Sequence, residues 1–259
     1  MDKKRPILLQ GAMEVEINYF KEVITDIEEV TIYGYEFLKG NFEGYPIIIS
    51  KTKVGLIEAS IATFIGITNF NPILVINQGT AGACTKNLHI GDIVIGDKCI
   101  NINSYITKPR KEKQGSIPLD WELLTFKDGK DELLELNADE ELRNIAIKRS
   151  NSYNVGKVIC GTIGSGDVWD NEIDRIKWFN EKYMILCEDM ETISTYSICN
   201  KLNIPTVGIR VISDNEITSE KYDKNIAIEA QKYVIEIVKE LVRSIDKWKK
   251  LYIEPNIGD

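Results

Sequence analysis

The sequence predicts one large α/β domain, on three observations. The chain has 259 residues, 43% of them hydrophobic and 28% charged, which is enough apolar material for one substantial core. Short apolar segments alternate along the chain with stretches in which apolar residues recur at helical spacing. The segment 73–77 is almost wholly apolar, as is typical of a strand covered by helices on both faces. We therefore expect residues 1–259 to fold as a single domain.

The expected strands are short apolar or alternating segments bounded by glycine, proline or polar residues. Segments 30–38 and 45–50 flank residues 40–44, which hold two glycines, so we expect these two strands to form a hairpin. In chain order, the expected strands cover residues 6–10, 30–38, 45–50, 73–77, 92–102, 156–163 and 206–212.

The expected helices follow these strands and show apolar residues at helical spacing. They cover about residues 13–27, 55–67, 139–150, 171–180, 191–202 and 224–252, and the last is long and amphipathic. Residues 107–130 are polar and have no clear periodicity, so we expect an irregular excursion there. A loop of this length is either functional or a surface insertion.

The charge balance narrows the class of partner. Lysine and arginine total 32 against 40 acidic residues, a formal net charge of -8. A nucleic-acid surface normally requires a basic excess, so no nucleic-acid partner is expected. The basic residues 1–6 precede only the short apolar run 7–9, which is too short for a signal peptide or a membrane span. We expect a cytoplasmic protein with a small-molecule ligand and no membrane partner.

Cysteine and histidine usage narrows the chemistry. The five cysteines are scattered and lack CxxC spacing, which disfavours a disulfide framework and a zinc site. His89 is the only histidine, so a histidine-based triad or a multi-histidine metal centre is disfavoured as well. We expect chemistry that depends on carboxylates, with no metal and no cofactor.

Four polar clusters follow directly after expected strands. They are residues 11–16, 79–82, 164–170 and 213–214. In open α/β sheets, ligands bind at the carboxyl ends of the strands. Taken alone, each cluster is equally consistent with a turn that needs glycine at positive φ. The four clusters together indicate one binding site.

Five motifs give the sequence a recognisable order. They are Gly11-Ala-Met-Glu-Val-Glu16, Asn77-Gln-Gly-Thr-Ala-Gly82 with Gly91-Asp-Ile-Val94, Ser165-Gly-Asp167, Glu188-Asp-Met-Glu191 and Ile209-Arg-Val-Ile-Ser-Asp214. Together they resemble the 5'-methylthioadenosine/S-adenosylhomocysteine nucleosidases of the purine nucleoside phosphorylase superfamily. The resemblance implies a three-layer α/β/α sandwich around a mixed, partly barrel-like central sheet. It also implies a nucleoside substrate and a homodimer in which the partner chain helps to line the site.

The resemblance assigns the proton transfers to Asp214 and Glu16. Asp214 matches the acid that protonates purine N7, which makes the base a neutral leaving group. An aspartate after a strand is otherwise a common N-cap of a following helix. Glu16 matches the glutamate that binds and activates the attacking water. Its other interpretation is a solvated glutamate in a first helical turn, which suits Glu14 better.

The resemblance also implies sugar-binding residues. Glu191 matches the acceptor for the ribose 2'- and 3'-hydroxyls, and Met190 would pack on the sugar, although a lone methionine usually fills a core. Thr80 matches a small hydroxyl residue near the water, on a turn where Gly82 lets the backbone approach. Arg210 matches an arginine that orients the carboxylates of the site, and a structural ion pair is equally consistent.

The base-binding residues depart most from the family. Trp169 matches an aromatic residue that stacks on adenine, although aromatic residues near strand ends more often pack in the core. Asp170 replaces an aliphatic residue whose backbone reads the adenine edge, which leaves a 6-amino and a 6-oxo base both open. Val54 aligns loosely with an apolar residue beside the 5' substituent. Met13 and Ser213 complete the expected binding residues.

The implied activity is hydrolysis of the N-glycosidic bond of an adenine nucleoside, 5'-methylthioadenosine or S-adenosylhomocysteine. A phosphate-dependent nucleoside phosphorylase is the nearest alternative. Phosphorylases carry arginine for phosphate where this chain offers Glu14, Glu16, Asn77 and Gln78, so phosphate would meet acidic and neutral side chains. A non-catalytic nucleoside-binding protein of the same fold is a further alternative, and the three candidate carboxylates disfavour it.

Overall fold

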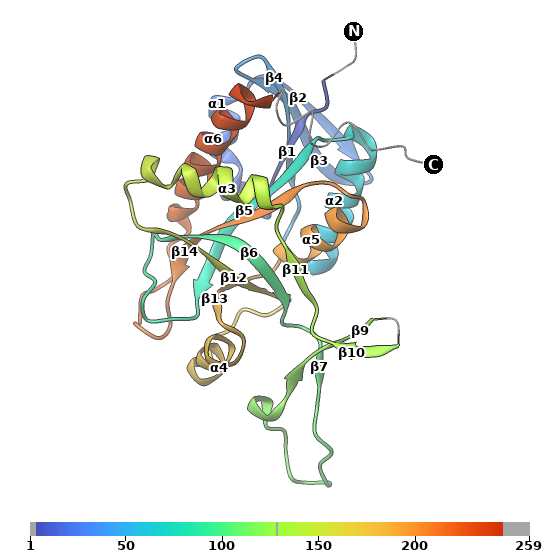
Figure 1. Ribbon diagram of the computed structural model, residues 1–259, viewed down its shortest axis with the longest axis vertical. Coiled ribbons are helices and arrows are strands. Elements are labelled where there is room, and N and C mark those ends of the chain that lie inside the picture. The colour runs from blue at the N-terminus through green and yellow to red at the C-terminus, as the bar shows by residue number, and fades with distance from the viewer. Residues whose placement is uncertain (1–3, 128, 246–259) are drawn as a thin grey trace.

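A mixed β-sheet lies at the centre of the folded protein, with helices on both of its faces (Figure 1). The computed structural model describes residues 4–127 and 129–245. The strands of the sheet are β1 (Ile7–Gly11), β2 (Thr25–Ile32), β3 (Tyr35–Phe42), β4 (Tyr45–Lys51), β5 (Leu74–Ala83), β6 (Ile93–Asn101), β11 (Glu135–Asn137), β12 (Val158–Ser165), β13 (Ile185–Asp189) and β14 (Thr206–Asp214). The helices are α1 (Asn18–Val23), α2 (Leu56–Phe70), α3 (Glu140–Lys148), α4 (Ile173–Tyr183), α5 (Thr192–Lys201) and α6 (Ala227–Arg243).

Part of the sheet closes into a small barrel. β5 pairs with β14, β14 with β6, β6 with β12, β12 with β13, and β13 returns to β5. From β5 the sheet continues outward through β1, β4, β3 and β2. β1 and β14 both run parallel to β5, whereas β13 is antiparallel to it. The predicted mixed, partly barrel-like sheet is therefore confirmed, and β1, β5 and β14 end on the same side of the sheet.

Alternation along the strands directs apolar side chains to both faces of the sheet, where each set packs against its own helices. Ile7 and Leu9 of β1 point toward the layer of α1, α3 and α6, whereas Leu8 points toward α2 and α5. In β5, Ile76 likewise points toward the layer of α1, α3 and α6, and Val75 points toward α2 and α5. Figure 1 shows α6 and α1 on one side of the sheet and α2 and α5 on the other. The predicted three-layer arrangement is confirmed.

The N-terminal third differs from the prediction. The expected helix at 13–27 is shorter, because a 3₁₀ turn η1 (Glu14–Glu16) and α1 end by Val23, and residues 25–32 form β2. Two hairpins, β2-β3 and β3-β4, replace the single expected one. Their two-residue turns, Tyr33-Gly34 and Glu43-Gly44, have positive φ at both residues, the geometry that matches strand twist. The first turn was missed because tyrosine rarely adopts positive φ.

β13 was not predicted as a strand, since its apolar residues Ile185 to Cys187 are followed at once by Glu188 and Asp189. It is a strand because it pairs with β12 and β5.

Short paired strands form within and directly beside the expected excursion at 107–130. β7 (Tyr105–Ile106) pairs with β8 (Glu122–Leu123), and β9 (Thr125–Lys127) pairs with β10 (Lys130–Glu132). In Figure 1 this arm extends away from the main sheet.

The last expected helix corresponds to α6, which ends at Arg243. Its expected continuation over 246–252 lies outside the described residues. α6 is preceded by the 3₁₀ turn η4 (Lys224–Ile226), where the prediction placed the helix start. Across residues 4–127 and 129–245, none of the helices combines the length and the apolar character that a membrane crossing requires.

Candidate active site

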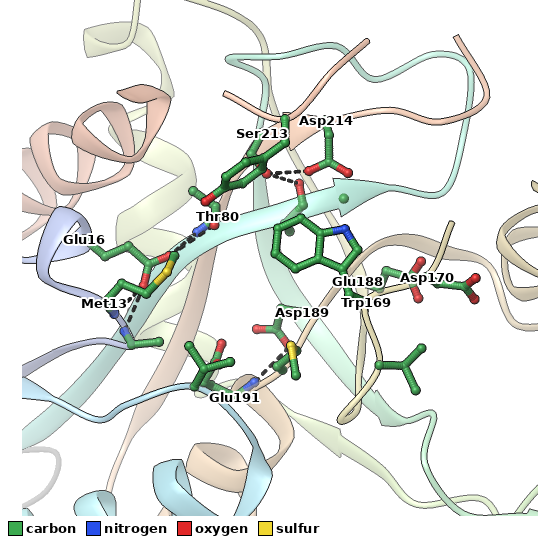
Figure 2. A pocket seen from close by; sticks show the side chains of 17 residues that line it. Met13, Glu16, Thr80, Trp169, Asp170, Glu188, Asp189, Glu191, Ser213 and Asp214 are labelled. Atoms are coloured by element: carbon green, nitrogen blue, oxygen red, sulfur yellow. Dashed lines mark hydrogen bonds between the residues drawn. The ribbon is translucent and has the colours of Figure 1, made fainter. Parts of the chain in front are cut away.

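A cavity of about 640 Å³, part of it open to solvent, lies beside the carboxyl ends of β1, β5, β13 and β14 (Figure 2). Eleven of the twelve predicted site residues line it: Met13, Glu16, Val54, Thr80, Gly82, Trp169, Asp170, Met190, Glu191, Ser213 and Asp214. The twelfth, Arg210, is 1% exposed and lies behind the cavity wall. Residues far apart in the sequence are thus brought to one place by the sheet.

Glu16 is held by four hydrogen-bond donors. Its Oε2 accepts from the backbone N–H groups of Ala12 (2.8 Å) and Met13 (3.1 Å). Its Oε1 accepts from the backbone N–H (2.8 Å) and the hydroxyl (3.1 Å) of Thr80. The side chain is only 3% exposed, so the carboxylate has one fixed orientation at the cavity wall. Glu14, by contrast, lies outside the cavity and forms ion pairs with Lys21 and Lys51.

Asp214 is the last residue of β14, and its buried carboxyl group lies across the cavity from Glu16. The hydroxyl of Ser213 donates to its Oδ1 at 2.7 Å. Burial raises the pKa of Asp214, and the hydrogen bond from Ser213 opposes that rise. A Cβ atom at Gly82 would lie 3.1 Å from Asp214 Oδ2, so glycine leaves room beside this oxygen. No helix follows directly, since the next helical turn in the described chain begins at Lys224, and the N-cap interpretation does not hold.

Glu191 lies next to a buried ion pair. Its Oε1 accepts from the backbone N–H of Gly55 at 3.1 Å, and its Oε2 lies 4.0 Å from the Arg210 guanidinium. Arg210 is engaged mainly by Asp189 and by the side-chain oxygen of Asn77. Burial, with the negative charge of Asp189, raises the pKa of Glu191, and Arg210 opposes the rise. Arg210 therefore fixes Asp189 directly and faces Glu191 at longer range.

Two aromatic side chains flank the cavity. The rings of Trp169 and Tyr222 lie 5.1 Å apart between centroids at 72°, an edge-to-face pair. Trp169 is 59% exposed, so its ring is available to a ligand and is not part of the core. Figure 2 shows the indole between Asp214 and the end of the cavity that holds Asp170 and Glu188.

Two further acidic residues, Asp170 and Glu188, lie at this end of the cavity. Asp170 Oδ1 accepts from the backbone N–H of Glu172 at 2.9 Å, and its Oδ2 is 3.3 Å from Arg175 Nε. Burial raises the pKa of Asp170. Glu188, on β13, lines the same end of the cavity. Within residues 4–127 and 129–245, no group of three or more histidine, cysteine or acidic side chains is arranged to hold a metal ion.

The sequence matches a known protein superfamily over nearly its whole length. A sequence model described as the phosphorylase superfamily matches residues 6–243, nearly the whole chain. The chain belongs to the phosphorylase superfamily.

Within the superfamily, the chain is similar to proteins named 5'-methylthioadenosine/S-adenosylhomocysteine nucleosidase. The one from Geobacillus sp. (strain WCH70) is 29% identical over 247 residues, covering 93% of this chain and 99% of the relative. Its counterpart from Bacillus thuringiensis (strain Al Hakam) is 26% identical over 241 residues, covering 91% and 99%.

Solved structures agree with this fold. The nucleosidase of the same name from Neisseria meningitidis, in complex with methylthio-immucillin-A, has a TM-score of 0.75 and 25% identity, covering 92% of this chain and 100% of that chain. The native structure of futalosine hydrolase from Helicobacter pylori strain 26695 has a TM-score of 0.77 at 24% identity, covering 92% and 98%, and shows the shared fold alone.

Six residues of this superfamily member line the cavity without having been singled out from the sequence: Ala12, Ala81, Val168, Glu188, Asp189 and Tyr222. Glu188 and Asp189 belong to the motif that contains Glu191, so their place next to it was the available signal. Tyr222 lies between β14 and η4, in a segment with neither helical nor strand pattern. Only the tertiary fold brings it against Trp169.

Proposed function

We propose that the chain hydrolyses the N-glycosidic bond of an adenine nucleoside, releasing adenine and a free sugar. The observation that carries the proposal is the convergence of three buried carboxyl groups, Glu16, Glu191 and Asp214, on one cavity. The similarity to proteins named 5'-methylthioadenosine/S-adenosylhomocysteine nucleosidase supports a 5'-thio nucleoside as the substrate.

Asp214 acts as the general acid in this proposal. Its raised pKa keeps the carboxyl group protonated at higher pH than an exposed aspartate, so it has a proton to donate to purine N7. Protonation of the base removes the negative charge that would otherwise develop on the departing purine. The Ser213 hydroxyl fixes the orientation of the carboxyl group.

Glu16 and Glu191 act on the sugar side. Cleavage passes through an oxocarbenium-like state, which a nearby carboxylate stabilises while it takes a proton from the attacking water. Glu16 suits this role, because four donors fix it at the wall and Thr80 adjoins it. Glu191 accepts from the ribose hydroxyls, and Met190 packs on the sugar. Trp169 stacks on the base, with Val54 and Met13 near the 5' group.

Water is favoured over phosphate as the nucleophile by the charge of the cavity. Among the described residues that line it, none is lysine or arginine. Arg210 is turned away, toward Asp189 and Asn77. A phosphate dianion beside the Glu16 carboxylate would therefore meet negative charge without a lysine or arginine at the cavity wall to compensate it.

A panel of nucleosides tests the proposed substrate class. Release of free base is measured from 5'-methylthioadenosine, S-adenosylhomocysteine, adenosine and inosine by chromatography. We expect the two thioadenosines to give the highest kcat/KM. Exclusive turnover of inosine would contradict the adenine assignment, and turnover of none of them would contradict the enzymatic proposal.

The fixed geometry around Glu16 gives a prediction for Gly79. A Cβ atom at this residue would lie 2.6 Å from Glu16 Oε1, so Gly79→Ala should displace the carboxylate. We expect kcat/KM to fall by about 100-fold, since small displacements of reacting groups are costly. Gly40→Ala is the matched control, because its Cβ would crowd Ile24 and neither residue lines the cavity. It should lower the melting temperature but leave the turnover of folded protein unchanged; equal activity losses in both variants would contradict the prediction.

We also propose a cytoplasmic homodimer. On α2, Ile57, Ile61 and Phe64 are 70%, 41% and 49% exposed, and their spacing places them on one helix face. The same helix begins beside Val54, which lines the cavity. A second copy of the chain seated on this face would cover the apolar side chains and adjoin the site.

Acidic substitutions on this face of α2 should dissociate the dimer into monomers. For Ile61→Asp combined with Phe64→Asp we expect a monomer by analytical ultracentrifugation, because two carboxylates would be buried unpaired in the interface. Glu181→Gln, an exposed change on α4, is the control and should leave the mass unchanged. A doubly substituted chain that remains dimeric would place the interface elsewhere.

A further inference from the structure

Glu188 is a buried acidic residue, and one oxygen of its carboxyl group has no hydrogen-bond partner among the described residues. The residue is 9% exposed and lines the cavity from β13. Within the described part of the chain, its Oε2 is shielded from solvent and receives no hydrogen bond. A buried polar atom without a partner is costly, and buried polar groups nearly always have one. The missing partner is therefore expected from a ligand.

The neighbouring charges do not supply that partner. Arg175, the nearby cation, faces Asp170 Oδ2 at 3.3 Å and also donates to the hydroxyl of Tyr105. Asp170 Oδ1 is engaged by the backbone N–H of Glu172. Asp170 Oδ2 likewise receives no hydrogen bond from the described residues, but it is compensated by its ion pair with Arg175. Glu188 forms no ion pair with the described residues and faces the cavity with accepting capacity left over.

The arrangement of the cavity identifies which part of a nucleoside reaches Glu188. Figure 2 shows Glu16 and Glu191 at one side, Asp214 above, and Glu188 and Asp170 at the opposite side beyond the Trp169 indole. With the sugar at Glu16 and Glu191 and purine N7 at Asp214, the six-membered ring of the base is directed toward Glu188. This orientation rests on the proposed function.

We propose that Glu188 is a specificity-determining residue that recognises the 6-amino group of the base. Its carboxyl oxygen accepts an N–H of that group, and a nucleoside whose base lacks an amino group there leaves the oxygen unpartnered. Glu188 thereby selects nucleosides of 6-aminopurines over nucleosides whose purine base has no 6-amino group.

The protonation of Glu188 fits an adenine edge. Burial, followed by the negative charge of Asp170, raises the pKa of Glu188 to about 8, against an opposing effect of Arg175. At pH 7 the Glu188 carboxyl group is therefore mainly neutral, and it presents a C=O acceptor beside an O–H donor. Adenine presents an N6–H donor beside the N1 acceptor, so the two edges are complementary.

Binding of free bases tests the assignment without requiring turnover. The Kd of adenine and of purine, which has hydrogen in place of the 6-amino group, is measured by calorimetry for the wild type, Glu188→Leu and Glu188→Gln. We expect the preference of the wild type for adenine to shrink by roughly 10- to 100-fold in Glu188→Leu, the range of one hydrogen bond to such a group. Glu188→Gln should keep the preference to within about 3-fold, because an amide offers the same acceptor and donor.

Comparing ratios within each variant cancels general losses of affinity. Glu181→Gln, exposed on α4, is the control and should reproduce the wild-type ratio. A Glu188→Leu ratio equal to that of the wild type, or a Glu188→Gln ratio that collapses, overturns the assignment. Should Glu188→Leu not fold, Glu188→Met replaces it with the same expected ratio. A ratio that changes as expected in a chain that hydrolyses no nucleoside would uphold the base assignment and remove the proposed function.

Discussion

Asp214→Asn should lower kcat for 5'-methylthioadenosine by roughly 10²- to 10⁴-fold, the range for loss of a general acid, while the nucleoside still binds. An asparagine fills the same space and can still accept from Ser213, but it has no acidic proton to transfer to purine N7. The measurement is base release under single-turnover conditions, with binding followed separately by calorimetry. Asp131→Asn, at an exposed aspartate on β10, is the control and should be as active as the wild type. Full activity in Asp214→Asn would remove this residue from the mechanism.

The pH dependence gives a second readout of the same group. Because Asp214 must be protonated, kcat/KM should fall as pH rises through its raised pKa. The Ser213 hydroxyl stabilises the ionised form and so lowers that pKa. Ser213→Ala should therefore raise the pKa and move the falling limb to higher pH. A limb that stays in place, or moves to lower pH, would mean that another group controls it.

Glu16→Gln should be nearly as damaging, with a loss in kcat of roughly 10²- to 10⁴-fold. The glutamate receives four donors on two oxygens. A glutamine has only one acceptor oxygen, so its amide nitrogen would face either the Ala12 and Met13 N–H groups or the N–H and hydroxyl groups of Thr80. The substitution removes the base and also leaves buried donors unmatched, which should cost about 1–3 kcal/mol of unfolding free energy.

The same 3₁₀ turn contains the control for this substitution. Glu14 is exposed and pairs with Lys21 and Lys51 outside the cavity, so Glu14→Gln should keep both activity and stability close to wild type. Kinetics and thermal unfolding of the two variants are compared side by side. Equal effects of Glu14→Gln and Glu16→Gln would contradict the distinction between the two glutamates.

The sequence predicts the strands correctly where the local residue pattern agrees with the tertiary environment. The apolar residues of β1, β5 and β14 predict buried strands, and the polar residues at their ends predict a site, because parallel strands deliver their ends to one edge. Glu16 and Asp214 follow from the family motifs that these ends carry. Their mutual placement across the cavity required the fold.

The sequence was uninformative where a neighbour decides the outcome. β13 is a strand through its pairing with β12 and β5, although acidic residues shorten its apolar run. The Tyr33-Gly34 turn is imposed by strand pairing against the preference of tyrosine. Arg210 was expected near the carboxylates of the site, yet its main partner, Asp189, could be recognised only once β14 and β13 were placed together.

The identity of the sugar product tests hydrolysis most directly. 5'-Methylthioadenosine is incubated with the protein in buffer free of phosphate and again with phosphate in large excess, and the sugar is identified by mass spectrometry. We expect adenine at the same rate in both buffers, and free 5-methylthioribose as the sugar in each. Adenine release that requires phosphate, with 5-methylthioribose 1-phosphate as the product, would contradict hydrolysis and make the protein a phosphorylase.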